Sequence, residues 1–410
     1  MKNKRKIHGK EKGITLIALA ITIVVMMILA GVAIGLAIGD GGILSGTREA
    51  VDMWNNAAEQ EQEGAQGITD YINDHLNDDD NGNGGGSGDN NENEWNTGTT
   101  VEEAKNQDKP FEEDTTIKDD LDNGVRIPGG FEIADDSGTK VEDGIVIEDS
   151  EGNQFVWIPA KTGSGVTINT RSGVKTIVYT RTNFNKQSGS YSEYSEALSS
   201  EEEKSVNANG GYYIGRYEAG DKVSTDAGRM RVSGDSQTNE VSIKKAQAPY
   251  NYISFTNMKY LAEGMDTARG YTATTRLASS YAWDTALSLI QIKNPSYTTT
   301  SAQGNYKDRP FSYANVGESE ISNSKDIGQS VLVPTGQTTA VSNIYDMGGN
   351  LVEYTSEIHK NSTQSTDYRY CFRGGYNESN SSTEPASYRM YDAGVPLYYG
   401  TFRVTLFLKN

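Results

Sequence analysis

Reactive side chains are scarce in this sequence of 410 residues. Its single cysteine is Cys371, and its three histidines are His8, His75 and His359. One cysteine excludes both an intramolecular disulfide and a cysteine-rich zinc site. So few imidazoles leave little for histidine-based acid–base or metal chemistry, and the G-x-S-x-G motif of serine hydrolases is absent. The residue types therefore predict a protein that is not an enzyme and has no redox cofactor.

The overall charge is strongly acidic. The formal net charge is −19 at pH 7, and the isoelectric point is about 4.7. Binding to a phosphate backbone requires clustered lysines and arginines. The composition therefore predicts that no nucleic acid is a partner.

Tyrosine is the prevailing aromatic residue, with 24 Tyr against 9 Phe, and residues 376–400 are rich in it. Tyrosine offers a large, rigid contact area, and the Ser and Asn side chains between the tyrosines offer adaptable hydrogen bonds. This mixture predicts a ligand-binding surface, with an ordinary polar loop region as the alternative. The candidate contacts are Tyr376, Asn377, Ser379, Asn380, Ser382, Tyr388, Tyr391, Asp392, Tyr398 and Tyr399.

The elements that must position these residues lie between residues 123 and 410. Short apolar runs alternate there with Gly, Asn, Ser and Tyr, a pattern typical of short strands joined by long loops. Two stretches, 254–265 and 278–290, have apolar residues at helical spacing. The pattern predicts an α+β region that forms one large domain or two fused small ones.

Five segments of this region, in order, resemble the formylglycine-generating-enzyme (sulfatase-modifying factor) family. The resemblance implies a C-type-lectin-like α+β fold over residues 123–410. The segments that carry it are 155–159 (FVWIP), 212–218 (YYIGRYE), 276–284 (RLASSYAWD), 343–356 (NIYDMGGNLVEYTS) and 372–404 with its FRGGY, YR and GTFRV parts.

The chemistry of that family implies a pair of thiols shortly after the R-G-G segment. The corresponding stretch here, 376–390, contains no cysteine, and Cys371 precedes that segment in an expected strand. A related branch binds iron through several histidines, and His359 is the only histidine after residue 75. The resemblance therefore implies a non-catalytic member, the alternative being a degenerate oxidase that recruits a metal through other residues.

Members of the family also hold a structural calcium ion near a G-N-x-x-E segment, through hard oxygen ligands. The matching positions here are the Asn350 side chain, the Leu351 carbonyl and the Glu353 carboxylate. The alternative is that Asn350 caps a turn and that Glu353 pairs with Arg373 or Arg403.

The placement of the tyrosine-rich region also resembles the variable proteins that diversity-generating retroelements target. In that class a lectin-like domain ends in a short region whose surface residues are diversified by adenine-directed mutagenesis. The resemblance implies that the candidate contacts vary between copies of the gene.

The N-terminus has the pattern of a membrane anchor. Residues 1–12 are rich in Lys and Arg, and residues 14–38 contain no charged side chain. A helix of that length, about 38 Å, can cross a hydrocarbon core of ~30 Å. The basic flank predicts a single-pass protein with residues 1–12 in the cytoplasm and the C-terminal domain outside the cell. A buried helix and a cleaved signal peptide are the alternatives.

The junction Gly13–Ile14 resembles a prepilin-type leader, basic and ending in Gly. The resemblance implies cleavage by a prepilin peptidase and contact with pilin-like subunits. The family has Glu at the fifth mature position, where this chain has Ala18. That departure favours a minor subunit or a simple membrane-anchored protein over a major pilin.

Between the anchor and the domain, residues 39–76 predict an amphipathic stalk helix with the two interruptions Gly64 and Gly67. Residues 77–122 predict an acidic, Gly- and Asn-rich linker without fixed structure, because its first part has too few apolar residues to offset the ordering entropy.

These features together predict a membrane- or pilus-anchored surface display protein of a bacterium. Its lectin-like head is expected to bind an extracellular protein or glycan. The alternative is a minor pilin-like structural subunit of a filament.

Overall fold

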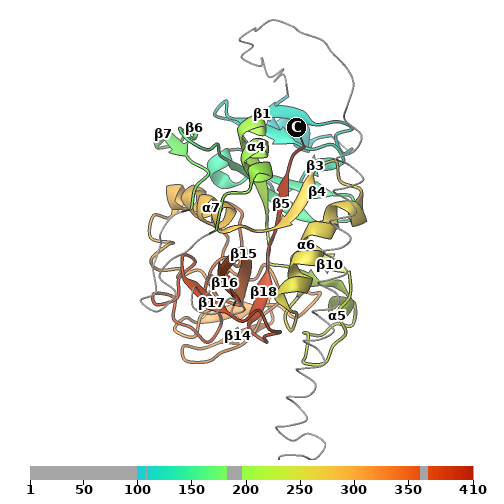
Figure 1. Cartoon of the computed structure of the whole chain (residues 1–410), viewed down its shortest axis with the longest axis vertical. Coiled ribbons are helices and arrows are strands. Elements are labelled where there is room, and N and C mark those ends of the chain that lie inside the picture. Colours follow the sequence, from blue (N-terminus) through green and yellow to red (C-terminus); the bar gives the residue numbers. More distant parts are fainter. Residues whose placement is uncertain (1–98, 108, 182–195, 361–367, 410) are drawn as a thin grey trace, which may run out of the picture. The chain divides into compact units, whose positions relative to one another are not determined.

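The computed structural model describes residues 99–107, 109–181, 196–360 and 368–409, drawn in colour in Figure 1. The predicted leader (1–13), membrane helix (14–38), stalk (39–76), first part of the linker and cleavage site at Gly13–Ile14 lie outside these residues. In the part that is described, none of the helices has the length and apolar character needed to cross a bilayer.

Antiparallel strands form the larger of the two main sheets, which has six strands in the order β12-β19-β8-β5-β4-β3. Its central strands β5 and β8 are buried along nearly their whole length, since they contain the apolar runs FVWIP and GYYIG. They agree with the short strands expected in this region. The bounds are β3 Phe131–Ile133, β4 Val146–Asp149, β5 Gln154–Pro159, β8 Gly211–Gly215, β12 Thr274–Leu277 and β19 Val404–Phe407.

A second sheet has four strands in the order β17-β16-β15-β18, and it lies below β5 in the view of Figure 1. Strands β15 and β18 are parallel, the other neighbours are antiparallel, and the register of β15 shifts between Tyr354 and Ile358. Arg403 alone separates β18 from β19, so the chain passes directly from one sheet into the other. The bounds are β15 Val352–Lys360, β16 Tyr368–Arg373, β17 Arg389–Asp392 and β18 Gly400–Phe402.

Both predicted helices are confirmed. Helix α6 (Phe255–Arg269) begins after the N-cap Ser254 and ends at Gly270, which adopts a left-handed conformation. Helix α7 (Ser280–Lys293) begins after the N-cap Ser279, packs against β5 and β15, and buries Trp283 and Leu287 completely. Two further helices are α4 (Ser200–Asn209) and α5 (Lys222–Asp226).

The predicted linker 77–122 is wrong for its described part. Helix α3 (Val101–Lys105) begins with a capping box in which Thr100 and Glu103 bond each other's backbone N–H groups. Strand β1 (Thr115–Lys118) pairs with β2 (Gly124–Ile127). Val101 and Ile117 are fully buried, and this apolar anchoring joins the segment to the domain although its overall composition is polar.

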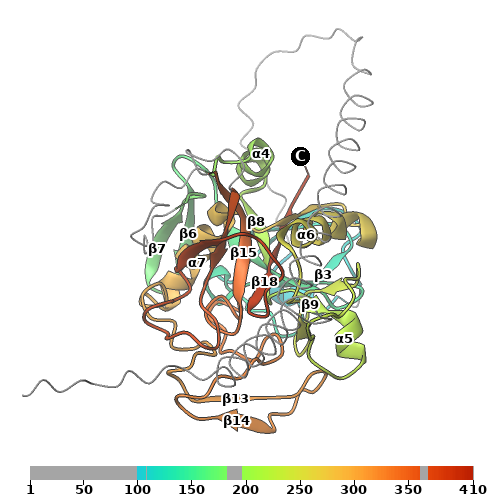
Figure 2. The same cartoon turned by 60° about the horizontal axis from the view of Figure 1, so that its bottom comes forward.

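Small sheets of two or three strands complete the described domain, and one of them, β13–β14, lies at its lower edge in Figure 2. The described chain is therefore mostly β-sheet with few helices, as the α+β prediction requires. The remaining elements are η1 Val141–Asp143, β6 Val166–Thr170, β7 Gly173–Ile177, β9 Gly220–Asp221, β10 Val241–Ser242, β11 Ala248–Pro249, β13 Phe311–Tyr313 and β14 Asn323–Lys325.

Candidate ligand-binding surface

The tyrosine-rich region consists of two loops and strand β17, the edge strand of the four-stranded sheet. One loop joins β16 to β17, and the other joins β17 to β18. Two hydrogen bonds hold the first loop against the segment that contains Thr298 and Ser301. The Ser387 hydroxyl donates to the Thr298 carbonyl, and the Ala386 N–H donates to Ser301 Oγ at 2.8 Å. Gly394 in the second loop lies directly against the Tyr370 ring, where a Cβ atom would collide with it. The first loop is therefore attached to the segment that follows helix α7, and the second loop packs against strand β16.

Three of the predicted contact tyrosines lie together and form what we term the tyrosine cluster, Tyr376, Tyr398 and Tyr399. The ring centroids of Tyr376 and Tyr399 are 5.0 Å apart, and those of Tyr398 and Tyr399 are 4.9 Å apart in an edge-to-face arrangement. Tyr398 is 45% exposed, and the other two are half-buried. The cluster thus presents aromatic surface to solvent from rings that already support one another.

Carboxylates surround the tyrosine cluster. The Tyr398 hydroxyl donates to Glu378 Oε1 at 3.4 Å, and the half-buried Asp392 carboxylate interacts electrostatically with Tyr399. Burial, followed by the charge of Glu378, raises the pKa values of Tyr376 and Tyr398; burial and then Asp392 do so for Tyr399. The phenols therefore stay protonated and can donate hydrogen bonds at neutral pH.

The other candidate contacts are divided between surface and interior. Asn380 and Ser382 are exposed on the first loop, and Ser381 between them is held by bonds to Asp308. Tyr391 is half-buried, and its hydroxyl donates inward to Glu357 Oε1 at 2.7 Å.

Three of the candidate contacts prove to be buried, and their assignment as surface residues is corrected. Asn377, Ser379 and Tyr388 are no more than 7% exposed. Ser379 Oγ accepts from the Tyr376 N–H and donates to Glu384, and the Tyr388 hydroxyl donates to Met390 Sδ at 3.3 Å. Their polar groups serve the loop itself, because buried polar groups need partners.

Sequence reasoning missed two residues of the surface. Glu378 lies within the tyrosine-rich region but was not selected. Tyr252 comes from a distant loop: its N–H donates to the Leu397 carbonyl at 2.9 Å, and Asn251 Nδ2 donates to the Tyr398 carbonyl at 2.6 Å. The positive φ of Tyr252, 52°, marks an unusual backbone position, but nothing in the local sequence indicates its neighbour.

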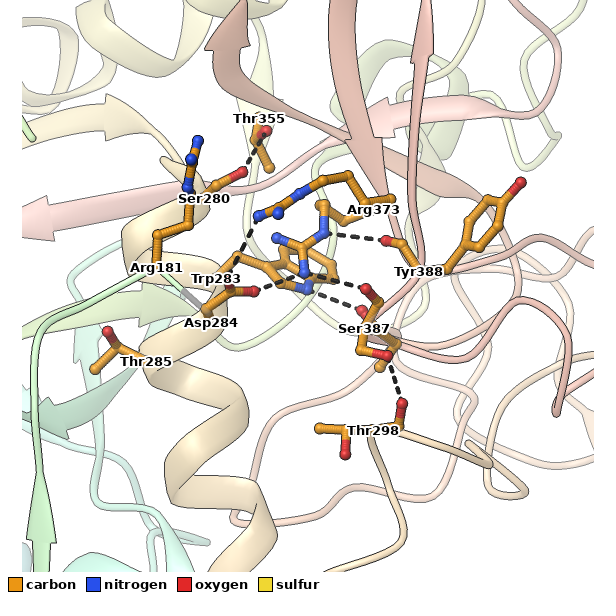
Figure 3. A network of polar contacts seen from close by, with 12 residues as sticks. Arg181, Ser280, Trp283, Asp284, Thr285, Thr298, Thr355, Arg373, Ser387 and Tyr388 are labelled. Carbon is orange, nitrogen blue, oxygen red and sulfur yellow. Dashed lines mark hydrogen bonds and ion pairs between the residues drawn. The ribbon is translucent and has the colours of Figure 1, made fainter. Parts of the chain in front are cut away.

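Beneath the first loop lies a network of buried charges, which Figure 3 shows in part. Asp284 Oδ1 accepts from Arg373 Nη2 at 2.6 Å, and Asp284 Oδ2 lies 3.3 Å from Arg389 Nη2. Arg389 Nε lies 3.3 Å from Glu357 Oε2. All four side chains are fully buried, so this network joins helix α7 to strands β15, β16 and β17.

Cys371 lies in β16 beside this network and is fully buried, as expected of a small apolar side chain in a strand. Burial, followed by the charge of Glu357, raises the pKa of its thiol. A thiolate is the reactive form of cysteine, so this thiol is not set up as a nucleophile.

Glu196 gives the domain a pH dependence that can be measured. Its carboxylate accepts from the Ser280 N–H at 3.0 Å and from Ser356 Oγ at 2.8 Å. Burial, followed by repulsion from Glu357, raises its pKa to about 8. A raised acid pKa means that the folded state binds the proton more tightly than the unfolded state. Its contribution is therefore complete below pH ~4.5 and is lost as the pH rises to about 8.

We therefore expect the free energy of unfolding to fall between pH 5 and 8, and Glu196→Gln to flatten that fall. Urea titrations of both proteins at pH 5, 6.5 and 8 would measure it. Glu353, whose pKa burial raises to about 7, contributes with the same sign, so some slope should remain. An unchanged slope in Glu196→Gln would contradict the assignment.

The predicted calcium ligands have protein partners. Asn350 Oδ1 accepts from the Val333 N–H at 3.0 Å, and Asn350 has a positive φ of 63°. Glu353 binds Arg403 with both carboxylate oxygens, and Leu351 is buried. These contacts match the alternative, a turn residue and an ion pair. The Glu353 carboxylate is paired with Arg403 and the Asn350 amide is bonded within the domain, and calcium binding stays a prediction.

Across the described ranges, no group of three or more His, Cys, Asp and Glu side chains could hold a metal ion.

Comparison with known proteins gives structural likeness without a family. No family model matches the sequence, and no curated protein matches it. PvdO from Pseudomonas aeruginosa has 16% identity and a TM-score of 0.33, covering 64% of this chain and 98% of that one. Treponema denticola variable protein 1 has 11% identity and a TM-score of 0.31, covering 62% and 95%. The P3c variant of the major tropism determinant has 12% identity and a TM-score of 0.26, covering 62% and 63%. At TM-scores below 0.5 these likenesses decide neither family nor function.

Proposed function

We propose that this chain is a non-enzymatic display protein whose C-terminal domain, of C-type-lectin-like type, binds an extracellular protein or glycan through the tyrosine cluster. The observation that carries the proposal is the convergence of Tyr376, Tyr398 and Tyr399 on one accessible surface. Rigid aromatic side chains with polar ends give much contact area for little lost rotamer entropy.

The attachment of the loops supports the same function. A binding surface of this kind needs loops that can vary in side chain while their ends stay fixed on a scaffold. Here Arg373 precedes the first loop and Arg389 follows it, and both are held by Asp284 in the interior. The exposed side chains between Arg373 and Arg389 take no part in these buried ion pairs. They could therefore vary without disturbing the ion pairs, as diversification by a retroelement would require.

The rest of the proposal comes from the sequence. The basic residues 1–12 and the uncharged run 14–38 favour a single-pass anchor in the cell membrane, and Gly13–Ile14 favours processing by a prepilin peptidase. Membrane fractionation of cells and N-terminal sequencing of the mature chain test both. Co-purification with a filament would support the second candidate function, a minor pilin-like subunit.

We expect Tyr398→Ala to weaken binding of the ligand about 30-fold, the effect of losing a central aromatic contact of ~2 kcal/mol. The full chain in detergent micelles would first be screened against protein and glycan arrays, and the affinity of each hit then measured for both variants. Tyr260→Ala is the matched control, because Tyr260 is a 64% exposed tyrosine on helix α6. Equal losses in the two variants, or no ligand on either array, would count against the proposal.

A further inference from the structure

Carboxylates lie close to the exposed part of the tyrosine cluster. Glu378 lies 3.4 Å from the Tyr398 hydroxyl. Asp392 Oδ1 accepts from the Tyr354 hydroxyl at 3.4 Å and interacts electrostatically with Tyr399. The charges of Glu378, Glu384 and Asp392, after burial, each raise the pKa of at least one cluster tyrosine.

The arginines of the same region are directed elsewhere. Arg373, Arg389 and Arg403 are fully buried, and each binds a buried carboxylate. Arg309 contacts the first loop at Ser381 Oγ, 3.1 Å away, but Asp308 binds the same serine and lies 3.9 Å from the guanidinium. These arginines are therefore held by carboxylates, in a chain whose net charge is −19.

The arrangement of the three rings favours a guanidinium over an ammonium group as the bound cation. A tyrosine face attracts a cation through the ring quadrupole, and carboxylates nearby add to the attraction. An ammonium cage needs rings spread around a cavity, but these centroids lie only 4.9 and 5.0 Å apart, so the rings fill the space between them. A cation can therefore reach only the outer faces and edges of the rings, beside the Glu378 carboxylate. A planar guanidinium can stack there and pair with the carboxylate at once, which a compact, strongly hydrated ammonium group does less well.

We propose that the partner of the tyrosine cluster is a protein surface that presents arginine, with a guanidinium stacked on the exposed Tyr398 ring and paired with Glu378. This rests on the proposed function and specifies its ligand class. Arginine is enriched together with tyrosine at protein interfaces, and the negative charge of the chain speeds the approach of a basic partner.

The probe is a fluorescent peptide with four arginines spaced by Gly-Ser, compared with its lysine counterpart of equal charge, on the full chain in detergent micelles. We expect the arginine peptide to bind about tenfold more tightly than the lysine peptide. Tyr398→Ala should remove that preference, and Glu378→Gln should weaken the arginine peptide about fivefold. Glu320→Gln, which neutralises an exposed acid near β14, is the matched control and should have no effect.

Equal binding of the two peptides, or equal effects of Glu378→Gln and Glu320→Gln, would overturn the inference, since both mean attraction to net charge alone. The array ligand separates this from the proposed function. A glycan or an uncharged protein that loses binding in Tyr398→Ala but not in Glu378→Gln would leave the display function intact and refute the arginine partner. A ligand unaffected by Tyr398→Ala would refute both.

Discussion

Replacing Arg403 with alanine is expected to destabilise the domain by about 3–5 kcal/mol, the usual effect of breaking a buried ion pair from one side. Arg403 is fully buried and binds Glu353 through two bonds, Nε to Oε2 at 2.7 Å and Nη2 to Oε1 at 2.5 Å. It also donates to the Gly215 carbonyl at 2.7 Å and to the Tyr345 carbonyl at 2.9 Å. One side chain thus joins both sheets and a loop.

The neighbourhood makes this loss large. Asp346 and Glu218 are buried nearby, and both contribute to the electrostatic field on Arg403. Without the guanidinium, Glu353 keeps its desolvation penalty and loses its counter-charge, while two buried carbonyls lose their donor. Because folded domains are stable by only about 5–15 kcal/mol, the variant should lose much of its margin.

Urea denaturation followed by tryptophan fluorescence would measure the loss. Arg229→Ala is the matched control, since Arg229 makes a two-bond contact with Asp235 at 2.8 Å but is 48% exposed; we expect less than ~1 kcal/mol there. The double variant Arg403→Met with Glu353→Leu should be more stable than Arg403→Ala, because no buried charge is left alone. An Arg403→Ala protein as stable as the control would contradict this account.

What the sequence predicts well is what local residues decide. Ser254 and Ser279 cap their helices through their own side chains, a bond that spans three residues. The FVWIP run is a buried strand because nearly every one of its side chains is apolar. Such elements depend little on distant parts of the chain, so periodicity and capping residues suffice to find them.

The start of the domain was misplaced for the opposite reason. The segment around Val101 and Ile117 is polar on average, and its few apolar residues are buried where α3 packs on β1 and β3 and where β1 pairs with β2. A composition window averages such residues away, so it extended the linker to residue 122.

The binding surface divides in the same way. The tyrosines of 376–400 could be found from composition, but exposure could not, because Ser379 is buried by its bond to Glu384, whereas Asn380 beside it is exposed. Tyr252 reaches the surface through a backbone bond to Leu397, far along the chain. Only the packed structure separates the exposed side chains from those that hold the loop.

The single replacement Asp284→Ala is expected to destabilise the domain by about 3–5 kcal/mol, because it also removes one side of a buried ion pair. Asp284 is fully buried on helix α7 and is shared by Arg373, at 2.6 Å, and Arg389, at 3.3 Å. Its removal leaves two buried guanidinium groups with less counter-charge, whereas Asp284→Asn keeps the shape and should lose less. Asp226→Asn, in an exposed pair with Lys222, is the control and should change the stability by less than ~1 kcal/mol.

The variant Asp284→Asn also tests whether the buried ion pairs affect the loop that carries part of the tyrosine cluster. Arg373 and Arg389 border the first loop, so we expect Asp284→Asn to increase backbone amide exchange in residues 374–392 before the domain unfolds globally. Ligand affinity should fall with it, because a loosened loop must be ordered again on binding. Tyr398→Ala should instead reduce affinity without changing exchange in that segment. If Asp284→Asn left both amide exchange and ligand affinity unchanged, the buried ion pairs would not be what orders the first loop. The positions of the tyrosines would then depend on other contacts with the sheets.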